Sequence, residues 1–252
     1  MIKWLIESEI FENNAKLLLD TLKKFGVEHQ VWPFGRLYED FDGCKDTIFY
    51  GSFQFADIAK DRCTVFCNLP KLDCLYYYPR FGNYLLNANY IMLPFGEIKR
   101  RKEWIVSNFG NEVFIRPSSG GKSFTGKVIK DWDKDLRFIR ADPETLVIIA
   151  KPVDIAYEWR TVVVEGKVIA SSQYKTFGRV VQRETVPEAL QYAQDVLNTV
   201  KYSPDPIWTL DICLTNNEFK VLEVGSFSCA GLYACDPEPI IHAVNYIMEN
   251  HS

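Results

Sequence analysis

An arginine followed by a loop of small residues is the first feature of this chain that could do chemistry. Arg116 follows the strand-forming residues 113–115 and precedes residues 118–123, which read SSGGKS. The paired glycines of this loop let backbone N–H groups turn toward an anion, and a neighbouring guanidinium suits phosphate. Pro117 lacks a backbone donor, so we expect the strand to end here. The stretch predicts a phosphate site, although a solvated hairpin loop would have a similar composition.

This loop does not match the Walker A pattern, which would need a glycine where Arg116 stands and a helix after the loop. Residues 125–130 instead have the pattern of a returning strand. We therefore expect a glycine-rich flap between two strands.

Two carboxylates lie in apolar runs that predict another hairpin, with strands at residues 207–214 and 218–224. Asp211 and Glu223 are each six residues from Asn217, so a three- or five-residue loop centred there places them opposite each other. Carboxylates at cross-strand distance repel unless a cation lies between them, and oxygen ligands suit Mg²⁺ that bridges nucleotide phosphates. In another register they would be separately paired surface residues.

Cysteine and histidine chemistry is less favoured. Several of the seven cysteines lie inside apolar runs, which suits reduced thiols in a cytosolic protein. Cys63 and Cys67 are four residues apart, but no second ligand pair lies near them in the sequence, so zinc binding is not predicted. His29, His242 and His251 are interpreted as surface or structural residues.

Composition narrows the class of protein. The 252 residues suffice for one or two domains, and 47% hydrophobic with 25% charged residues is ordinary for a globular chain. A net charge of -4 disfavours a dedicated nucleic-acid binder, although a local basic groove stays possible. No apolar run approaches the ~20 residues of a membrane-spanning helix, and the N-terminus lacks a signal-peptide pattern. We therefore expect a cytoplasmic protein without membrane association.

The first half alternates strands with helices, which predicts a small open α/β domain over residues 1–109. The first two strands flank a helix and should be parallel. The expected strands are residues 2–6, 27–32, 47–50 and 64–68. The expected helices are residues 11–25, with Phe11 on its apolar stripe, a helix ending at Lys60, and 97–109. The aromatic segment 72–93 could line a pocket or pack in the core.

The second half, residues 110–252, predicts antiparallel strands with segregated helices, an α+β arrangement. Besides the strands named above, we expect strands at 146–153, 158–164 and 167–174. The expected helices are 131–139, 187–200 and 236–250.

Taken in order, the charged residues of the second half resemble those of the ATP-grasp family. An arginine precedes a glycine-rich flap, a lysine ends a strand, an acid follows seven residues later, another lysine ends a strand, and two carboxylates share a hairpin. The resemblance covers about residues 110–230 and implies an ATP-grasp domain after the N-terminal α/β domain. Arg116, where most relatives carry lysine, is similar to the clade named for one arginine and two lysines.

The resemblance implies a role for each charged residue. Arg116, Lys175 and Arg160 would be catalytic, with Arg160 directed at the transferred phosphoryl group or the acyl substrate. Asp211 and Glu223 would hold Mg²⁺. The residues that would contact ATP are Arg116, Ser119, Gly120, Gly121, Lys122, Lys127, Lys151, Val153, Glu158 and Lys175. Within this set, 151–153 would meet adenine and Glu158 the ribose, and the clade's second lysine is either Lys127 or Lys151.

Enzymes of this family typically make an acyl-phosphate from a carboxylate and ATP, which an amine or thiol then attacks. The resemblance therefore implies an ATP- and Mg²⁺-dependent ligase that acts on small-molecule or peptide carboxylates and amines. A small-molecule kinase on the same fold and a non-catalytic nucleotide-binding or interaction module are the alternatives. The family usually has asparagine two residues after the second carboxylate, where this chain has Gly225, so weaker metal binding or loss of catalysis stays open.

Overall fold

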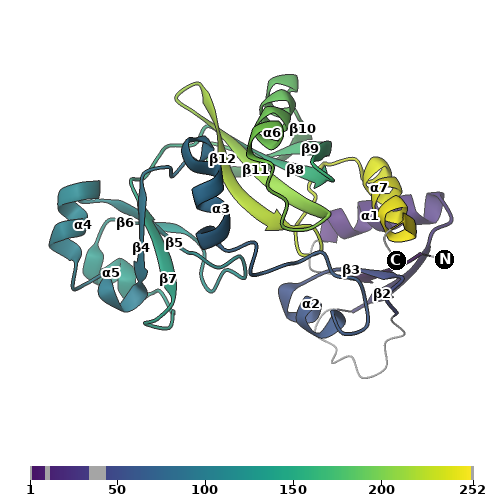
Figure 1. The fold of residues 1–252 in the computed structure, drawn as a ribbon, viewed down its shortest axis with the longest axis horizontal. Helices are drawn as coiled ribbons and strands as arrows, with labels where there is room; N and C mark the ends of the chain where they lie inside the picture. The colour runs from purple at the N-terminus through teal and green to yellow at the C-terminus, as the bar shows by residue number, and fades with distance from the viewer. Residues whose placement is uncertain (1, 9–11, 34–43, 251–252) are drawn as a thin grey trace.

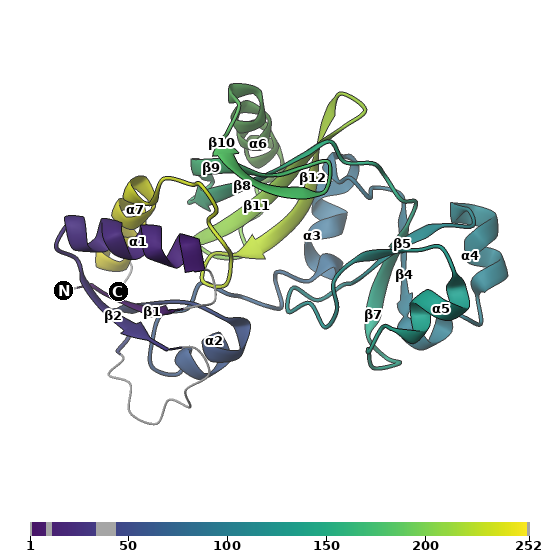
Figure 2. The ribbon, with the colours of Figure 1, turned by 180° about the vertical axis from the view of Figure 1, so that it is seen from behind.

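The computed structural model describes residues 2–8, 12–33 and 44–250, and its strands form three separate sheets (Figure 1). We call them the N-terminal sheet, the flap sheet and the hairpin sheet. Figure 2 shows the same arrangement from behind, with the hairpin sheet between the other two. The mixture of a parallel sheet with two antiparallel sheets confirms the expected fold class. Phe11 and His251 lie outside the described residues. Within those residues, no helix is long and apolar enough to cross a membrane.

The N-terminal sheet is parallel, with strand order β2-β1-β3. The expected βαβ unit is confirmed, because β1 and β2 pair in parallel. The elements of this unit are β1 (Lys3–Glu7), α1 (Glu12–Lys24), β2 (Glu28–Trp32), β3 (Thr47–Tyr50) and α2 (Phe53–Ala59). The strand expected at residues 64–68 is wrong: Thr64 makes a single bridge to Ile48. Phe66 instead exchanges hydrogen bonds with Ser228, so its backbone groups are not available to the sheet.

The C-terminal helix α7 (Pro237–Asn250) completes the N-terminal unit. It lies beside α1 in both ribbon views (Figures 1 and 2). Trp4, Leu18 and Val244 belong to one buried apolar cluster, and the Trp4 indole donates to Asn245 Oδ1 at 3.0 Å. The two ends of the chain therefore share a core.

The flap sheet is antiparallel, with strand order β4-β7-β5-β6. Its elements are β4 (Tyr90–Pro94), α4 (Lys102–Phe109), β5 (Val113–Pro117), β6 (Lys127–Ile129), α5 (Trp132–Arg137) and β7 (Leu146–Ala150). The expected helix at 97–109 starts later, at Lys102, after a 3₁₀ turn (Phe95–Glu97). Strand β4 and helix α4 precede the proposed boundary after residue 109, yet they share a core with β5 and β7.

Strand β5 extends through Arg116 to Pro117, two residues beyond the strand that we expected. Pro117 pairs with Val147 of β7, whereas the pairing of β5 with β6 stops at Ile115. The next residue, Ser118, donates its N–H to Leu146 O of β7, so the nitrogen of Pro117 faces the side where β6 has ended. The missing N–H therefore costs no ladder hydrogen bond.

The hairpin sheet is antiparallel, with strand order β10-β9-β8-β11-β12. Its strands are β8 (Tyr157–Val164), β9 (Lys167–Thr176), β10 (Arg179–Glu184), β11 (Ile207–Thr215) and β12 (Glu218–Ser226). Helix α6 (Pro187–Val200) packs on this sheet, and α3 (Cys74–Phe81) lies between it and the flap sheet (Figures 1 and 2). Strand β10 was not expected from the sequence. It is a mostly exposed edge strand, so its residues show no apolar alternation.

Candidate functional site

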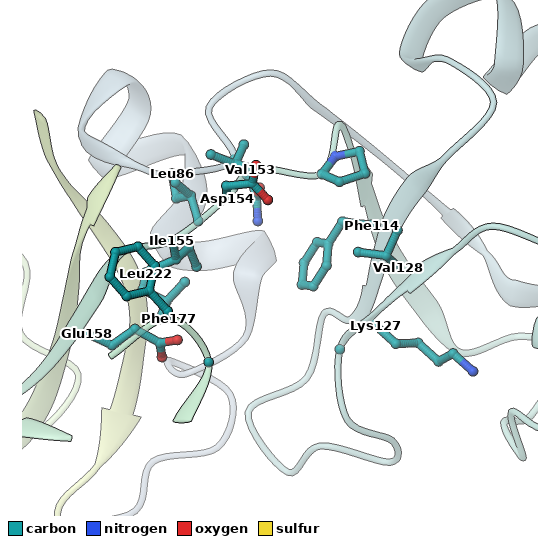
Figure 3. A pocket seen from close by; sticks show the side chains of 14 residues that line it. Leu86, Phe114, Lys127, Val128, Val153, Asp154, Ile155, Glu158, Phe177 and Leu222 are labelled. Atoms are coloured by element: carbon teal, nitrogen blue, oxygen red, sulfur yellow. The ribbon is translucent and has the colours of Figure 1, made fainter. Parts of the chain in front are cut away.

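Three cavities follow one another along the hairpin sheet. The first two lie between it and the flap sheet, and the third lies between it, the flap loop and α2. The first, of about 780 Å³, has mainly apolar walls that include Phe114, Val153 and Phe177. Figure 3 shows Phe114 and Phe177 on opposite sides of it, with the carboxylate of Glu158 at one end. Glu158 also lines the second cavity, of about 320 Å³, which contains most of the charged residues. The third, of about 200 Å³, shares Asp211 with the second.

Arg116 and Glu223 form a buried ion pair in the second cavity. Arg116 Nη2 lies 3.0 Å from Glu223 Oε1, and Lys122 Nζ from the flap lies 3.1 Å from the same oxygen. Burial alone would raise the pKa of Glu223, but the charges of Arg116 and Lys122 outweigh it and hold the pKa at about 2. Glu223 is therefore a carboxylate at neutral pH, held between two cations from the flap side.

Arg160 holds the second carboxylate. Its Nε and Nη2 donate to Asp211 Oδ1 and Oδ2 at 2.5 and 2.9 Å, a bidentate pair. Its Nη1 donates to Gly231 O at 2.9 Å, in the loop between β12 and α7, which we call the 227–236 loop. Burial would lower the pKa of Arg160, but Asp211 raises it above its ordinary value. All three guanidinium nitrogens therefore bind the protein itself, while Arg160 still lines the second and third cavities.

A tyrosine that the sequence analysis missed joins the two acidic centres. The Tyr174 hydroxyl lies 2.6 Å from Glu158 Oε2 and 3.2 Å from Asp211 Oδ2, and Lys175 Nζ lies 3.1 Å from Glu158. Burial and the two carboxylates raise the pKa of Tyr174, so its proton stays in place to donate. A β-bulge places Tyr174 here, because Glu158 pairs with Lys175 while the next residue, Trp159, pairs with Gln173. Simple alternation would put Tyr174 and Lys175 on opposite faces.

The β11–β12 hairpin brings Asp211 opposite Glu223, but not through the loop that we expected. The connection is a two-residue turn at Asn216 and Asn217, both with positive φ, rather than a three- or five-residue loop. That turn alone would pair Asp211 with Leu222. A bulge between Asp211 and Ile212 leaves Leu222 unpaired and restores the Asp211–Glu223 pair, and both carboxylates line the second and third cavities.

The carboxylates of the site fit a Mg²⁺ ion that takes few ligands from the protein. No group of three or more potential metal ligands occurs in the part of the chain that the structure describes. Asp211 and Glu223 alone match a Mg²⁺ ion that takes one or two protein carboxylates and completes its shell with phosphates and water. Their mutual repulsion is already relieved by Arg160, Arg116 and Lys122, so it does not by itself demand a metal.

A neighbouring side chain occupies the space that a side chain at position 225 would need. Gly225 pairs across the hairpin with Thr209, and a Cβ atom added to Gly225 would lie 2.6 Å from Thr209 Oγ1. Thr209 lines the third cavity beside Asp211. An asparagine at position 225 would therefore require Thr209 to move.

The remaining predicted residues divide into two groups. Val153 and Gly120 line the first and third cavities respectively. Lys127 lines the first, but its side chain extends away from the cavity in Figure 3, and its Nζ lies 3.4 Å from Asp135 O. The predicted residues that do not line these three cavities are Ser119, Gly121 and the exposed Lys151.

Comparison with known proteins identifies similar sequences and folds. A model of the ATP-grasp domain, family 2 of the clade named for one arginine and two lysines, matches residues 93–243. The D-cycloserine synthetase DcsG has a TM-score of 0.66 and 13% identity, covering 98% of this chain and 100% of its own. The ATP-grasp ligase PsnB, solved with a minimal precursor, has a TM-score of 0.61 and 13% sequence identity, and the match covers 98% of both chains. D-alanine–D-alanine ligase from Bacillus anthracis has a TM-score of 0.56 and 13% sequence identity, and the match covers 100% of both chains. No curated protein matches the chain.

Proposed function

We propose that this chain, which belongs to the arginine-and-two-lysines clade of the ATP-grasp family, is an ATP- and Mg²⁺-dependent carboxylate–amine ligase. The observation that carries the proposal is the order of the three cavities. An apolar cavity with aromatic walls leads into a cavity lined by arginine and lysine, and this leads into a small third cavity. A nucleotide has the same order of chemistry, from an apolar base to anionic phosphates, and the third cavity would receive the groups to be joined.

The base and ribose would occupy the first cavity. Phe114 and Phe177 flank it, and aromatic faces stack well on a purine ring. Glu158, where the first cavity meets the second, would accept hydrogen bonds from ribose hydroxyls. Lys175 and Tyr174 hold this carboxylate in place.

The phosphates would occupy the second cavity. Arg116 supplies a fixed guanidinium, while Lys122 is half exposed on the flap and free to turn from Glu223 to a phosphate oxygen. Lys175, about a third exposed, faces the same cavity. Asp211 and Glu223 would hold Mg²⁺, which supplies charge neutralisation for the phosphates when it is bound.

The reaction follows from these positions. A substrate carboxylate in the third cavity would attack the terminal phosphorus of ATP, giving an acyl-phosphate and ADP, and an amine would then displace phosphate. Arg116, Lys122 and Lys175 would stabilise the negative charge on the transferred group. Arg160, bound to Asp211 and Gly231, would hold one metal ligand and the 227–236 loop in position. The acyl substrate and the amine would be small molecules or peptides.

Nucleotide binding with and without Mg²⁺ tests this proposal. In calorimetric titrations, Asp211→Asn and Glu223→Gln should weaken binding of Mg·ATP more than binding of metal-free ATP, because the lost contact is to the metal. Glu218→Gln is the matched control, since this exposed carboxylate lies on the same strand as Glu223 and pairs with Lys220. It should bind both forms as the wild type does.

Turnover completes the test. ADP release that requires both a carboxylate and an amine supports a ligase, and release with a hydroxyl acceptor alone would support a kinase instead. If the wild type does not bind ATP, or if Mg²⁺ changes neither binding nor turnover, the ligase proposal is overturned and an interaction module replaces it.

A further inference from the structure

Two cysteine thiols meet behind the third cavity. Cys67 lies in the segment between α2 and α3, and Cys229 lies in the 227–236 loop. Cys67 packs against the buried apolar cluster that contains Cys229, although 162 positions separate the two residues in the chain. Cys229 is buried and lines the third cavity together with Asp211 and Glu223. Cys67 is half-buried and lines a separate cavity of about 260 Å³ on the other side.

The backbone holds this thiol pair together. Phe66 N–H donates to Ser228 Oγ at 2.9 Å, and Ser228 N–H donates to Phe66 O at 3.3 Å. Gly51 N–H donates to Ser228 O at 2.8 Å, which fixes the loop to the end of β3. Because Cys67 and Cys229 each follow a residue of this pair, these bonds hold the two cysteine backbones side by side.

Cys67 differs from the buried cysteines in the direction in which its pKa is shifted. The Cys229 side chain lowers the pKa of Cys67 despite its burial, and the Cys67 side chain, with burial, raises the pKa of Cys229. Burial raises the pKa of Cys63 and Cys235 to about 11 and that of Cys213 to about 12. Since the thiolate is the nucleophile, Cys67 should react first with an oxidant.

We propose that Cys67 and Cys229 form a reversible disulfide in response to a hydroperoxide. The Cys67 thiolate attacks one peroxide oxygen, the O–O bond breaks, and the departing oxygen takes up a proton to leave as an alcohol or water. This gives the Cys67 sulfenic acid. The Cys229 sulfur then attacks the Cys67 sulfur and displaces its hydroxyl, which takes the Cys229 proton and leaves as water. Two thiols are oxidised and one peroxide is reduced.

Formation of the bond should alter the site. A disulfide brings the sulfurs to about 2.05 Å, closer than two thiols in contact, so Cys67, Cys229 or both must shift, and we expect the 227–236 loop to take part. The same loop contributes Gly231 O to Arg160, and Tyr233, which stacks on Tyr174 with ring centroids 4.7 Å apart. The disulfide chemistry stands by itself, whereas its effect on turnover rests on the proposed ligase function.

Peptide mapping of the full chain tests the disulfide. The reduced protein is treated with hydrogen peroxide, its remaining thiols are alkylated, and it is digested without reductant for mass spectrometry. We expect free thiols to fall from seven to five and one peptide pair to join Cys67 with Cys229. Cys67→Ser should abolish this pair, while Cys44→Ser, which removes an exposed thiol, should leave it in place. Oxidation of the wild type without a Cys67–Cys229 link would overturn the proposal. Because this measurement uses the wild type, it does not depend on whether a variant folds.

Activity and binding separate the two proposals. Peroxide should lower turnover by about tenfold or more and dithiothreitol should restore it, because small shifts of catalytic groups are costly. Affinity for ATP should change little, since neither thiol lines the first cavity. Cys67→Ser should keep its turnover under peroxide.

A wild type that forms the disulfide but never binds ATP would contradict the ligase proposal and support the disulfide proposal. Disulfide formation with unchanged turnover in an active enzyme would limit the pair to a modification site without control.

Discussion

Ion pairs between arginines and carboxylates dominate the site at the scale of single residues. Arg116 is bound to Glu223, and Arg160 is bound to Asp211 by two hydrogen bonds. Removing one member of a buried pair leaves the other charge without compensation, which costs more than the pair itself contributes. For substitutions at these residues, both ligand affinity and the free energy of unfolding should therefore be measured.

Arg116 should bind phosphate and also stabilise Glu223. Arg116→Ala should weaken ATP binding by about 1.5–3 kcal/mol, the scale of a hydrogen bond to a charged group. Arg116→Lys should have a smaller effect, because the charge stays and the forked geometry is lost. Calorimetry would measure both, with Arg179→Ala on the exposed strand β10 as control. Unchanged ATP affinity in a folded Arg116→Ala protein would rule out this role.

Glu223 predicts how stability depends on pH. Its pKa is about 2 in the folded chain against an ordinary 4.5, so the charged form favours folding by about 3 kcal/mol above pH 4.5. This contribution is lost as the pH falls from 4.5 toward 2. Denaturant unfolding in metal-free buffer should show Glu223→Gln well below the wild type at pH 7 and closer to it near about pH 3. A difference that stays constant with pH would contradict the depressed pKa, and Glu218→Gln serves as the exposed control.

At the scale of elements, β-bulges decide which side chains meet. One bulge between β8 and β9 adds Tyr174 to the face that carries Lys175, and one between β11 and β12 sets Glu223 opposite Asp211. Each bulge changes the register by one residue, which is enough to move a side chain to the other face of a sheet.

The Thr209–Gly225 pair gives a prediction for the β11–β12 hairpin. Gly225→Ala should destabilise the chain by about 1–3 kcal/mol, because the added Cβ atom would overlap the Thr209 hydroxyl. Thr209→Ala removes that hydroxyl, so the double variant should be more stable than the sum of the two single changes indicates. Unfolding free energies of the four proteins form the cycle. Additive effects would show that the overlap is absorbed elsewhere.

At the scale of the whole molecule, the N-terminal unit depends on the last helix of the chain. Val244 of α7 is fully buried with residues of β1 and α1, whereas Tyr246 on the same helix is 62% exposed. Helix α7 therefore packs against the first elements of the chain. The 227–236 loop connects the candidate site to this core.

Substitutions in α7 test this dependence. Val244→Asp should destabilise the protein by more than about 4 kcal/mol and perturb the environment of Trp4, because it buries an unpaired charge. Tyr246→Asp, the matched control, should have little effect. Thermal unfolding and near-ultraviolet circular dichroism would measure both. Equal behaviour of the two variants would show that α7 does not complete the N-terminal core.

The amino-acid sequence alone determined most of the local elements, the order of the charged residues and the family. Periodicity predicted the βαβ unit and the main hairpins, since each depends on neighbours within a few tens of residues. The match to the ATP-grasp clade named for one arginine and two lysines confirms the resemblance drawn from Arg116, the flap, the lysines and the two carboxylates.

Tertiary structure alone decided the partners of those residues. The bulge that presents Tyr174 lies in a predicted hairpin, but no local pattern encodes its register shift. The pairing of Arg160 with Asp211 and the packing of Cys67 near Cys229 join segments whose approach no local pattern encodes. The exposed strand β10 and the return of α7 to the N-terminal sheet have the same origin. Local sequence sets where a strand or helix forms. Register shifts and ion pairs depend instead on how apolar surfaces are buried and charges are paired across the whole fold.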